Sequence, residues 1–218
     1  MIKGAFIVLE SGGLVGFIPR SIPFQYNPET LRRQLTPFVA REQESSSETE
    51  TTVAPFEPDE RITISIVLDA SEALERPDEN PLTSVIGLSG YLAQLEQLLY
   101  PVGQNFVGSG DLLSSGDAPP RRPRAPVLLF SWGASRILPV RLTSFSVDEK
   151  SFTPALYAIR AEVSVGMTVV SPRAFGANPT FMEEVAIAAY RVTMAQKELL
   201  AASSMVDTAA ETLAFITG

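Results

Sequence analysis

The sequence of 218 residues contains neither cysteine nor histidine. The lack of cysteine excludes disulfides, thiolate zinc sites, iron–sulfur ligation and thiol nucleophiles. The lack of histidine excludes imidazole metal ligands, histidine general bases and the serine–histidine–aspartate triad. An enzyme built on this sequence would depend on carboxylates, lysine or tyrosine, so the commonest catalytic sets are excluded.

Basic residues and long apolar runs are also scarce. Lys and Arg total 17 against 25 Asp and Glu, and the resulting net charge of -8 repels phosphate backbones, so we expect no nucleic-acid partner. No stretch approaches the roughly 20 apolar residues of a membrane-spanning helix. The apolar N-terminal run ends at Glu10 without a cleavage pattern, so we expect cytoplasmic assembly, no signal peptide and no membrane insertion.

Catalytic patterns are equally absent from the sequence. Gly108-Ser109-Gly110 lacks the Gly-Lys-Ser/Thr ending of a phosphate-binding loop, and no G-x-S-x-G, H-E-x-x-H or calcium-binding loop is present. Acidic residues on turns and polar strand faces are most simply solvated; they are Asp69, Glu72, Asp148, Glu149 and Glu162. We therefore predict no enzymatic activity, no cofactor and no metal site.

Alternating apolar residues predict an antiparallel sheet with one solvated face. We expect strands at 61–69, 127–132, 137–147 and 157–170, and the alternation shifts parity near Thr143 and Ser144, which predicts a bulge. Trp132, the one tryptophan, is expected to anchor the core or sheet. The predicted fold class is α+β, mainly β, with an antiparallel β-barrel or sandwich and one packed helix.

Helical periodicity occurs within 84–100, where apolar residues share one stripe that should pack across the sheet or close a barrel end. The stripe comprises Val85, Leu88, Leu92, Leu95 and Leu99. A short helix is also expected at 29–35. Residues 41–60 hold seven acids and one arginine, typical of a mobile surface loop or a segment ordered only by a partner. Residues 102–126 read as a loop whose arginines are solvated or contact an acidic partner.

The last part of the chain, 176–218, is predicted to be a helical extension of a domain spanning 1–175. Thr180 and Glu183 form a capping box, followed by helical segments at 181–202 and 205–216. One face carries Met182, Val185, Ala189, Val192 and Leu199. Two interpretations remain open: this face packs on its own domain, or it is the interface with another subunit or partner.

Four short motifs, in order along the chain, carry a resemblance to a known family. They are Asn27-Pro28, Leu68-Asp69, Phe130-Ser131-Trp132-Gly133 and Arg160-Ala161-Glu162-Val163. Over roughly residues 4–170 the chain resembles the tube-protein domain family of contractile injection systems, whose best-known members are tube initiators or baseplate adaptors in extracellular phage-tail-like particles.

The resemblance implies a phage tail-tube-like fold and a structural role. Six copies would form a ring that continues the inner tube onto the spike, with inner-tube, spike or hub, baseplate and possibly sheath proteins as partners. On the polar face of the last strand, Glu162, Ser164 and Thr168 would then be candidates for the channel lining.

One departure from the family affects the expected position in the particle. Many relatives carry a LysM-like module after this domain, whereas this chain continues into an Ala-rich helix from Phe181. A position at the cap-proximal end of the tube is therefore the alternative. The alternative of another class is a free-standing binding module, which one Trp and five Tyr make less well equipped with aromatic platforms.

Overall fold

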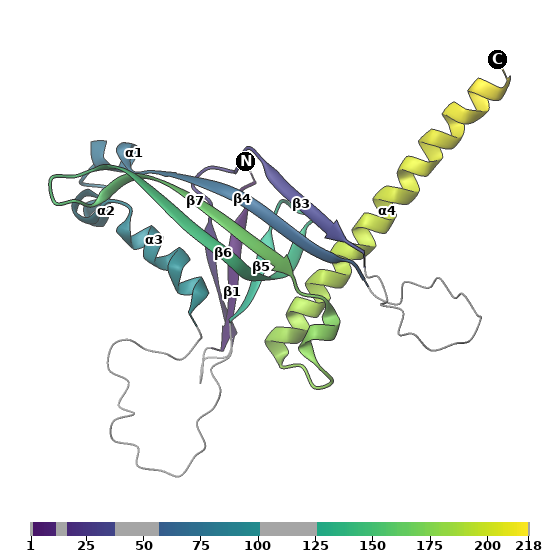
Figure 1. The fold of residues 1–218 in the computed structure, drawn as a ribbon, viewed down its shortest axis with the longest axis horizontal. Coiled ribbons are helices and arrows are strands. Elements are labelled where there is room, and N and C mark those ends of the chain that lie inside the picture. Colours follow the sequence, from purple (N-terminus) through teal and green to yellow (C-terminus); the bar gives the residue numbers. More distant parts are fainter. Residues whose placement is uncertain (1, 12–16, 38–56, 101–125, 218) are drawn as a thin grey trace, which may run out of the picture.

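The computed structural model describes residues 2–11, 17–37, 57–100 and 126–217, which form a twisted sheet with helices at its face and ends (Figure 1). The strands are β1 (Ala5–Ser11), β2 (Phe17–Pro23), β3 (Leu31–Thr36), β4 (Asp59–Asp69), β5 (Val127–Ser131), β6 (Ile137–Phe152) and β7 (Ala158–Val169). The helices are α1 (Ser71–Glu75), α2 (Pro81–Ile86), α3 (Ser89–Glu96) and α4 (Phe181–Thr217), with 3₁₀ turns η2 (Gln97–Leu99) and η4 (Pro172–Phe175).

All seven strands belong to one antiparallel sheet with the order β2-β1-β5-β6-β7-β4-β3. Strands β2 and β3 are therefore its two ends. Short β-hairpins connect several neighbours, whereas β1 pairs with β5 across a long sequence separation. The predicted mainly-β α+β class is confirmed.

The core lies on one face of this sheet because apolar residues alternate along the strands. On β4, Ile62, Ile64, Ile66 and Leu68 are all buried, and the register places them beside the buried apolar residues of β7. Helix α3 covers this face, and Leu92 and Leu95 of the helix, Leu88 at its N-cap and Leu98 of η2 join the same cluster. The prediction that an amphipathic helix packs across the sheet is confirmed for α3.

An aromatic group fills the core beneath β1 and β5. Phe6, Phe24 and Phe130 are fully buried, and Trp132 stacks on Phe130 with ring centroids 5.8 Å apart and an interplanar angle of 22°. Such offset contacts add to the stabilisation from burial. The predicted role of Trp132 as an anchor of the core is confirmed.

The predicted bulge is present in β6, where the pairing with β7 shifts between Leu142 and Ser144. Strand β6 runs on to Phe152, five residues beyond the predicted end, because its polar second half stays paired with β7. Periodic burial ends before the pairing ends, so alternation underestimates the length of a strand whose end is solvated on both faces.

The single helix predicted over 84–100 is wrong. The chain turns at Gly87, whose φ is +55° and whose Cβ, if it had one, would lie 2.4 Å from the Ala158 carbonyl oxygen. That oxygen accepts a hydrogen bond from Leu88 N at 2.9 Å. The break changes the helical phase, so Val85 is 66% exposed and Leu98, rather than Leu99, is buried.

The predicted helix at 29–35 is also wrong, because Leu31–Thr36 is strand β3, paired antiparallel with the outer side of β4. The predicted loop 41–60 ends too late: β4 begins at Asp59, and Glu60 is 6% exposed. Residues 41–56 of that loop, and 102–125 of the predicted loop 102–126, lie outside the described residues. Strand β3 forms by pairing with β4, and the start of β4 is extended by its pairing with β3. Pairing between segments far apart in the chain leaves no local pattern in the sequence, so neither difference was predictable.

Helix α4 is one continuous helix rather than the two predicted segments. Ser203 and Ser204 do not interrupt it because their hydroxyls donate to the carbonyl oxygens of Leu200 and Ala201, three residues earlier. The capping box is confirmed: Thr180 N donates to Glu183 Oε2 at 2.7 Å and Glu183 N donates to the Thr180 hydroxyl at 3.4 Å.

Figure 1 shows the first half of α4 crossing one end of the sheet and its C-terminal half projecting beyond the body. The opposite end of the sheet carries α1 and α2. Among the described residues, no helix has the length and apolar character needed to cross a membrane.

Candidate assembly surfaces

The motif residue Asn27 ties the N-terminus to the end of β2. Gly4 N donates to Asn27 Oδ1 at 2.8 Å, and Asn27 Nδ2 donates to the carbonyl oxygen of Ile2 at 3.0 Å. Pro28 follows it and is half-buried. These two hydrogen bonds hold the start of β1 beside the end of β2.

A second network joins the ends of β2, β4 and β7 around Asp69. Gln25 Nε2 donates to the main-chain oxygen of Asp69 at 2.6 Å, and Asp69 N donates back to Gln25 Oε1 at 2.9 Å. The Asp69 carboxylate accepts hydrogen bonds from Ser71 N at 2.8 Å and from Arg160 Nε at 2.8 Å. The bonds from Ser71, with Arg160 adding to them, hold the pKa of Asp69 below its usual value.

Two predicted motif residues, Asp69 and Arg160, are thus brought into direct contact, whereas Gln25 was missed. An amide can both donate and accept, which is what the two main-chain groups of Asp69 require. The only sequence signal for Gln25 is its place at the end of an apolar strand just before the Asn-Pro turn.

The remaining motif positions shape the β5–β6 hairpin and the core. Trp132 N donates to the carbonyl oxygen of Arg136 at 2.8 Å, and Gly133 has a φ of +74°, which glycine adopts without strain. Ala161 is buried on β7 beneath α3. Trp132 and Ala161 thus contribute to the core, and Gly133 lies in the turn between β5 and β6.

The three candidates for a channel lining share the polar outer face of the sheet, on β7. Ser65 donates to Glu162 Oε1 at 2.8 Å, and Lys150 Nζ lies 3.1 Å from Glu162 Oε2. The Ser65 bond, followed by Lys150, holds the pKa of Glu162 below its usual value. Ser164 lies between Ser65 and a further serine of β6 in the register, and Thr168 lies near the far end of the strand.

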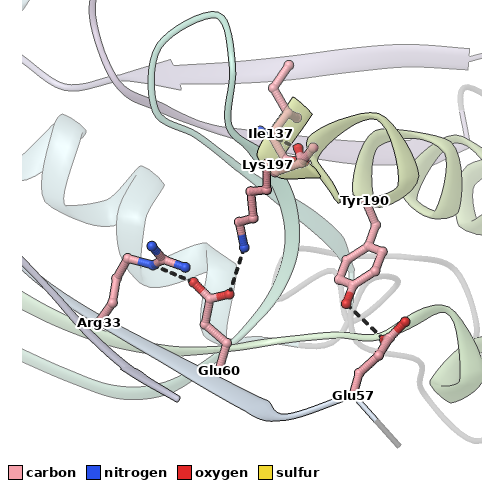
Figure 2. Close-up of polar contacts among 7 residues, drawn as sticks. Arg33, Glu57, Glu60, Ile137, Tyr190 and Lys197 are labelled. Carbon is pink, nitrogen blue, oxygen red and sulfur yellow. Dashed lines mark hydrogen bonds and ion pairs between the residues drawn. The ribbon is translucent and has the colours of Figure 1, made fainter. Parts of the chain in front are cut away.

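A different polar cluster fastens α4 to the sheet (Figure 2). The carboxylate of Glu60 on β4 bonds to Arg33 Nε at 2.6 Å and to Lys197 Nζ at 3.3 Å. Burial raises the pKa of Glu60, but the hydrogen bonds and charges of Arg33 and Lys197 outweigh burial, so the pKa is lowered overall. Glu60 therefore stays ionised and joins β3, β4 and α4.

Two further contacts hold the same helix. The Tyr190 hydroxyl donates to Glu57 Oε2 at 2.8 Å, and burial together with that carboxylate raises the pKa of Tyr190. Thr193, which is buried, donates to the Ile137 carbonyl oxygen at 2.8 Å and accepts from Ile137 N at 3.1 Å. Together with Lys197, these contacts fix the direction in which the rest of α4 projects.

The five predicted interface residues of α4 divide into two groups. Met182, Val185 and Ala189 are partly buried against the chain's own sheet, in the cluster around Leu129. Val192 and Leu199 are exposed, and further along α4 Leu200 and Met205 are exposed as well. The start of the helix therefore packs on its own domain, and the described side chains from Leu199 to Met205 are exposed.

Nothing in the described part of the chain resembles a metal centre, since no group of three or more acidic residues there could hold an ion. The candidate sites considered for assembly are surfaces and polar networks. They comprise the outer sheet face, the Glu60 cluster and the projecting half of α4.

Comparison with known families places these features in context. The family model described as contractile injection system tube protein matches residues 17–174, which is more than half of the chain and extends from β2 into η4. No curated protein matches the chain. Helix α4 begins at Phe181 and lies beyond the matched residues. The chain therefore belongs to the contractile injection system tube protein family and has a structural role in such a system.

Proposed function

We propose that this chain forms a hexameric ring at the end of the inner tube, where it joins the tube to the spike and baseplate and nucleates tube assembly. The observation that carries the proposal is the projecting half of α4, which follows the tube-family residues and exposes Leu199 and Met205, each 70% exposed. Exposed apolar side chains gathered on one element are typical of protein–protein contacts.

The position at an end follows from how rings stack. A ring inside a tube has identical rings on both sides, so its stacking surfaces are sufficient to hold it in place. A terminal ring meets a different protein on one side and needs an additional surface for it. Helix α4 provides such a surface without contributing a strand to the sheet.

The sheet supports the ring arrangement. Its inner face is apolar and covered by α3, and its outer face is polar. We propose that Glu162, Ser164 and Thr168 line the channel. The charge of Glu162 is balanced by Lys150, so the surface around it is hydrated without a strong field, as suits a passage for cargo.

The proposal divides the chain into a tube domain and an extension that binds partners. Residues 1–175 form the tube domain and 176–218 the partner-binding extension. Assembly takes place in the cytoplasm, the particle resembles a phage tail, and the chain acts without catalysis, cofactor or nucleic acid. Its partners are other copies of itself and the tube, spike or hub, baseplate and sheath proteins.

The position can be tested by crosslinking from a single defined site. Because the chain has no cysteine, Leu199→Cys introduces one thiol that can carry a benzophenone photo-crosslinker. Purified particles containing this variant are irradiated and crosslinked peptides identified by mass spectrometry. We expect spike and baseplate subunits as products. The matched control, Gln94→Cys on the exposed side of α3, should not give the same products.

Two other outcomes of the crosslinking would contradict the proposed position. Products containing cap and distal sheath proteins would move the ring to the cap-proximal end and preserve the fold. Absence of the chain from intact particles would overturn a structural role in the particle and favour a free-standing binding module.

The channel lining is tested separately. Ser164→Asp adds a charge to the outer face without removing the Lys150–Glu162 ion pair. We expect normal particle yield and altered cargo loading. The control Gln94→Glu adds the same charge on α3 and should leave loading unchanged; equal loading in both variants would contradict a lumenal position for Ser164.

A further inference from the structure

Helix α4 has two nearly opposite faces, and the chain itself uses one of them. The face that packs on the sheet holds Ala186, Tyr190 and Thr193, which are buried, and Lys197, which bonds to Glu60. With 3.6 residues per turn, a second row of side chains lies on nearly the opposite side of the helix. This row, the α4 seam, consists of five exposed residues: Ala188, Val192, Ala195, Leu199 and Ala202.

The α4 seam repeats with the period of a coiled coil. Its members are spaced alternately four and three residues apart, which is the heptad pattern that keeps one apolar stripe facing a partner helix. Val192 and Leu199, at one of the two heptad positions, are 58% and 70% exposed, and the other position is alanine each time. The opposite face already makes the contact with the sheet, so the fold of the single chain does not require this period.

The alternation of large and small side chains makes the seam complementary to itself. When two heptad helices pair antiparallel, the first apolar position of one faces the second apolar position of the other. In two copies of this chain, Leu199 would meet Ala188 of the second copy, and Val192 would meet Ala195. Each layer then holds one large and one small side chain, as close and even packing requires. A parallel pair would place large beside large and alanine beside alanine, which leaves alternate layers overfilled or empty.

The charges beside the seam favour this same alignment. Arg191 and Glu198 flank the seam on one side and are exposed, and in the described part of the chain neither has an ion-pair partner. They lie two turns apart on their own helix, which is too far for a bond between them. The alignment places Arg191 beside Glu198 of the second copy, twice by symmetry. A shift of one heptad in either direction would bring together two glutamates or two arginines.

The position of the seam leaves room for a second copy. Because the sheet lies against the opposite face of α4, through contacts such as that of Thr193 with Ile137, two paired helices would carry their domains on their outer sides. Residues 188–202 span about 21 Å along the helix. Such an interface is at the low end of the size range of specific contacts, so we expect a dimer that separates readily.

We propose that α4 pairs antiparallel with α4 of a second copy through the seam, and that this pairing holds the free chain as a two-fold dimer. Neighbours in one ring meet through two different surfaces, whereas a two-fold contact uses the same surface of both copies. The paired copies are therefore not neighbours in one ring, and the dimer must separate before α4 binds a partner in the particle. Only this last consequence rests on the proposed function.

The first test measures the mass of the free full chain by sedimentation velocity over the micromolar concentration range, without other particle proteins. We expect monomer to convert to dimer as the concentration rises. Ala195→Glu places a charge in the seam and should weaken dimerisation at least tenfold. The matched control Ala201→Glu makes the same change on α4 outside the seam and should leave dimerisation unchanged. Both alanines are exposed, so neither substitution should disturb the fold of the monomer.

Charge exchange tests the alignment of the two copies. Glu198→Arg brings two arginines together on each flank and should weaken the dimer. Adding Arg191→Glu to this variant restores opposite charges at both flanks and should restore the affinity. A role of either residue within its own chain would not produce such a rescue, because the two side chains do not reach each other on one helix.

Disulfide formation tests the direction of the pairing. The chain has no cysteine, so Ala188→Cys and Leu199→Cys can be prepared separately with different tags, mixed and oxidised. In the antiparallel pair these two positions share a layer, and the mixed disulfide should form. A disulfide between two copies of the same variant would have to bridge an offset of about 16 Å along the helix axis, whereas the two Cα atoms must lie within about 7 Å.

Three results would overturn the proposal. A chain that stays monomeric over the whole range would leave the seam to a helix of another protein. Oligomers that Ala195→Glu leaves intact would show that a different surface joins the copies. Disulfides between identical variants, in place of the mixed product, would exclude the antiparallel arrangement. The position in the tube is tested separately on intact particles, so failure of either test does not decide the other.

Discussion

The substitution Glu60→Gln tests whether one buried carboxylate anchors α4. The side chain of Glu60 is 7% exposed, and its partners Arg33 and Lys197 are 28% and 34% exposed. Hydrogen bonds to charged groups contribute about 1.5–3 kcal/mol each, but the partial exposure of both cations reduces these values through solvent screening. The carboxylate also loses hydration on burial, which offsets part of the remainder.

We therefore expect Glu60→Gln to lower the free energy of unfolding by about 2 kcal/mol at neutral pH. For a chain of this size, that corresponds to a fall of about 4–8 °C in Tm. The assay is urea unfolding of the isolated chain, followed by the fluorescence of Trp132 and by far-ultraviolet circular dichroism. Glu149→Gln is the control, because Glu149 is exposed and should change stability by less than about 0.5 kcal/mol.

The difference should also depend on pH. Because the folded-state pKa of Glu60 is lowered from its usual value of 4.5, the wild-type chain gains stability from it above that pH. That gain is lost as the pH falls through the lowered pKa, so the two chains should converge in acid. Equal stability at neutral pH, or a difference that persists unchanged in strong acid, would refute the assigned role of Glu60.

Three further outcomes are expected from urea unfolding of single variants. Gly87→Ala should cost at least about 2 kcal/mol, because of the positive φ and the close main-chain oxygen, whereas Gly90→Ala, in an ordinary helical position, should be neutral or stabilising. Leu95→Ala should cost about 2–5 kcal/mol and Leu99→Ala under 1, and equal losses would contradict the observed phase of α3 and η2. Gln25→Glu should cost about 2 kcal/mol at neutral pH and recover in acid, because a carboxylate there cannot donate to the main chain at the end of β4.

Strands whose core-facing residues alternate were predictable from the sequence alone. On β4 and β7 each second residue is apolar, and only one assignment of faces buries them. The bulge in β6 was predictable for the same reason, since a shift of parity must be absorbed somewhere along the strand. The capping box of α4 involves residues three apart and therefore leaves a local signal.

Features decided by distant contacts were not predictable. Strand β3 is polar and short, and it is extended only because β4 offers it an unpaired edge. The break at Gly87 depends on a carbonyl oxygen from β7, 71 residues later in the chain. Glu60 was assigned to an acidic loop because its two cationic partners come from β3 and α4.

Composition, alternation and motif order were enough to exclude the commonest catalytic sets and to indicate a mainly-β tube protein with a helical extension. They suffice because a sheet with one solvated face imposes a period of two on the sequence. Which residues of α4 pack on its own domain and where Glu60 lies depend on tertiary structure. Those properties arise from the meeting of segments far apart in the chain, and no local pattern encodes which groups remain exposed after they meet.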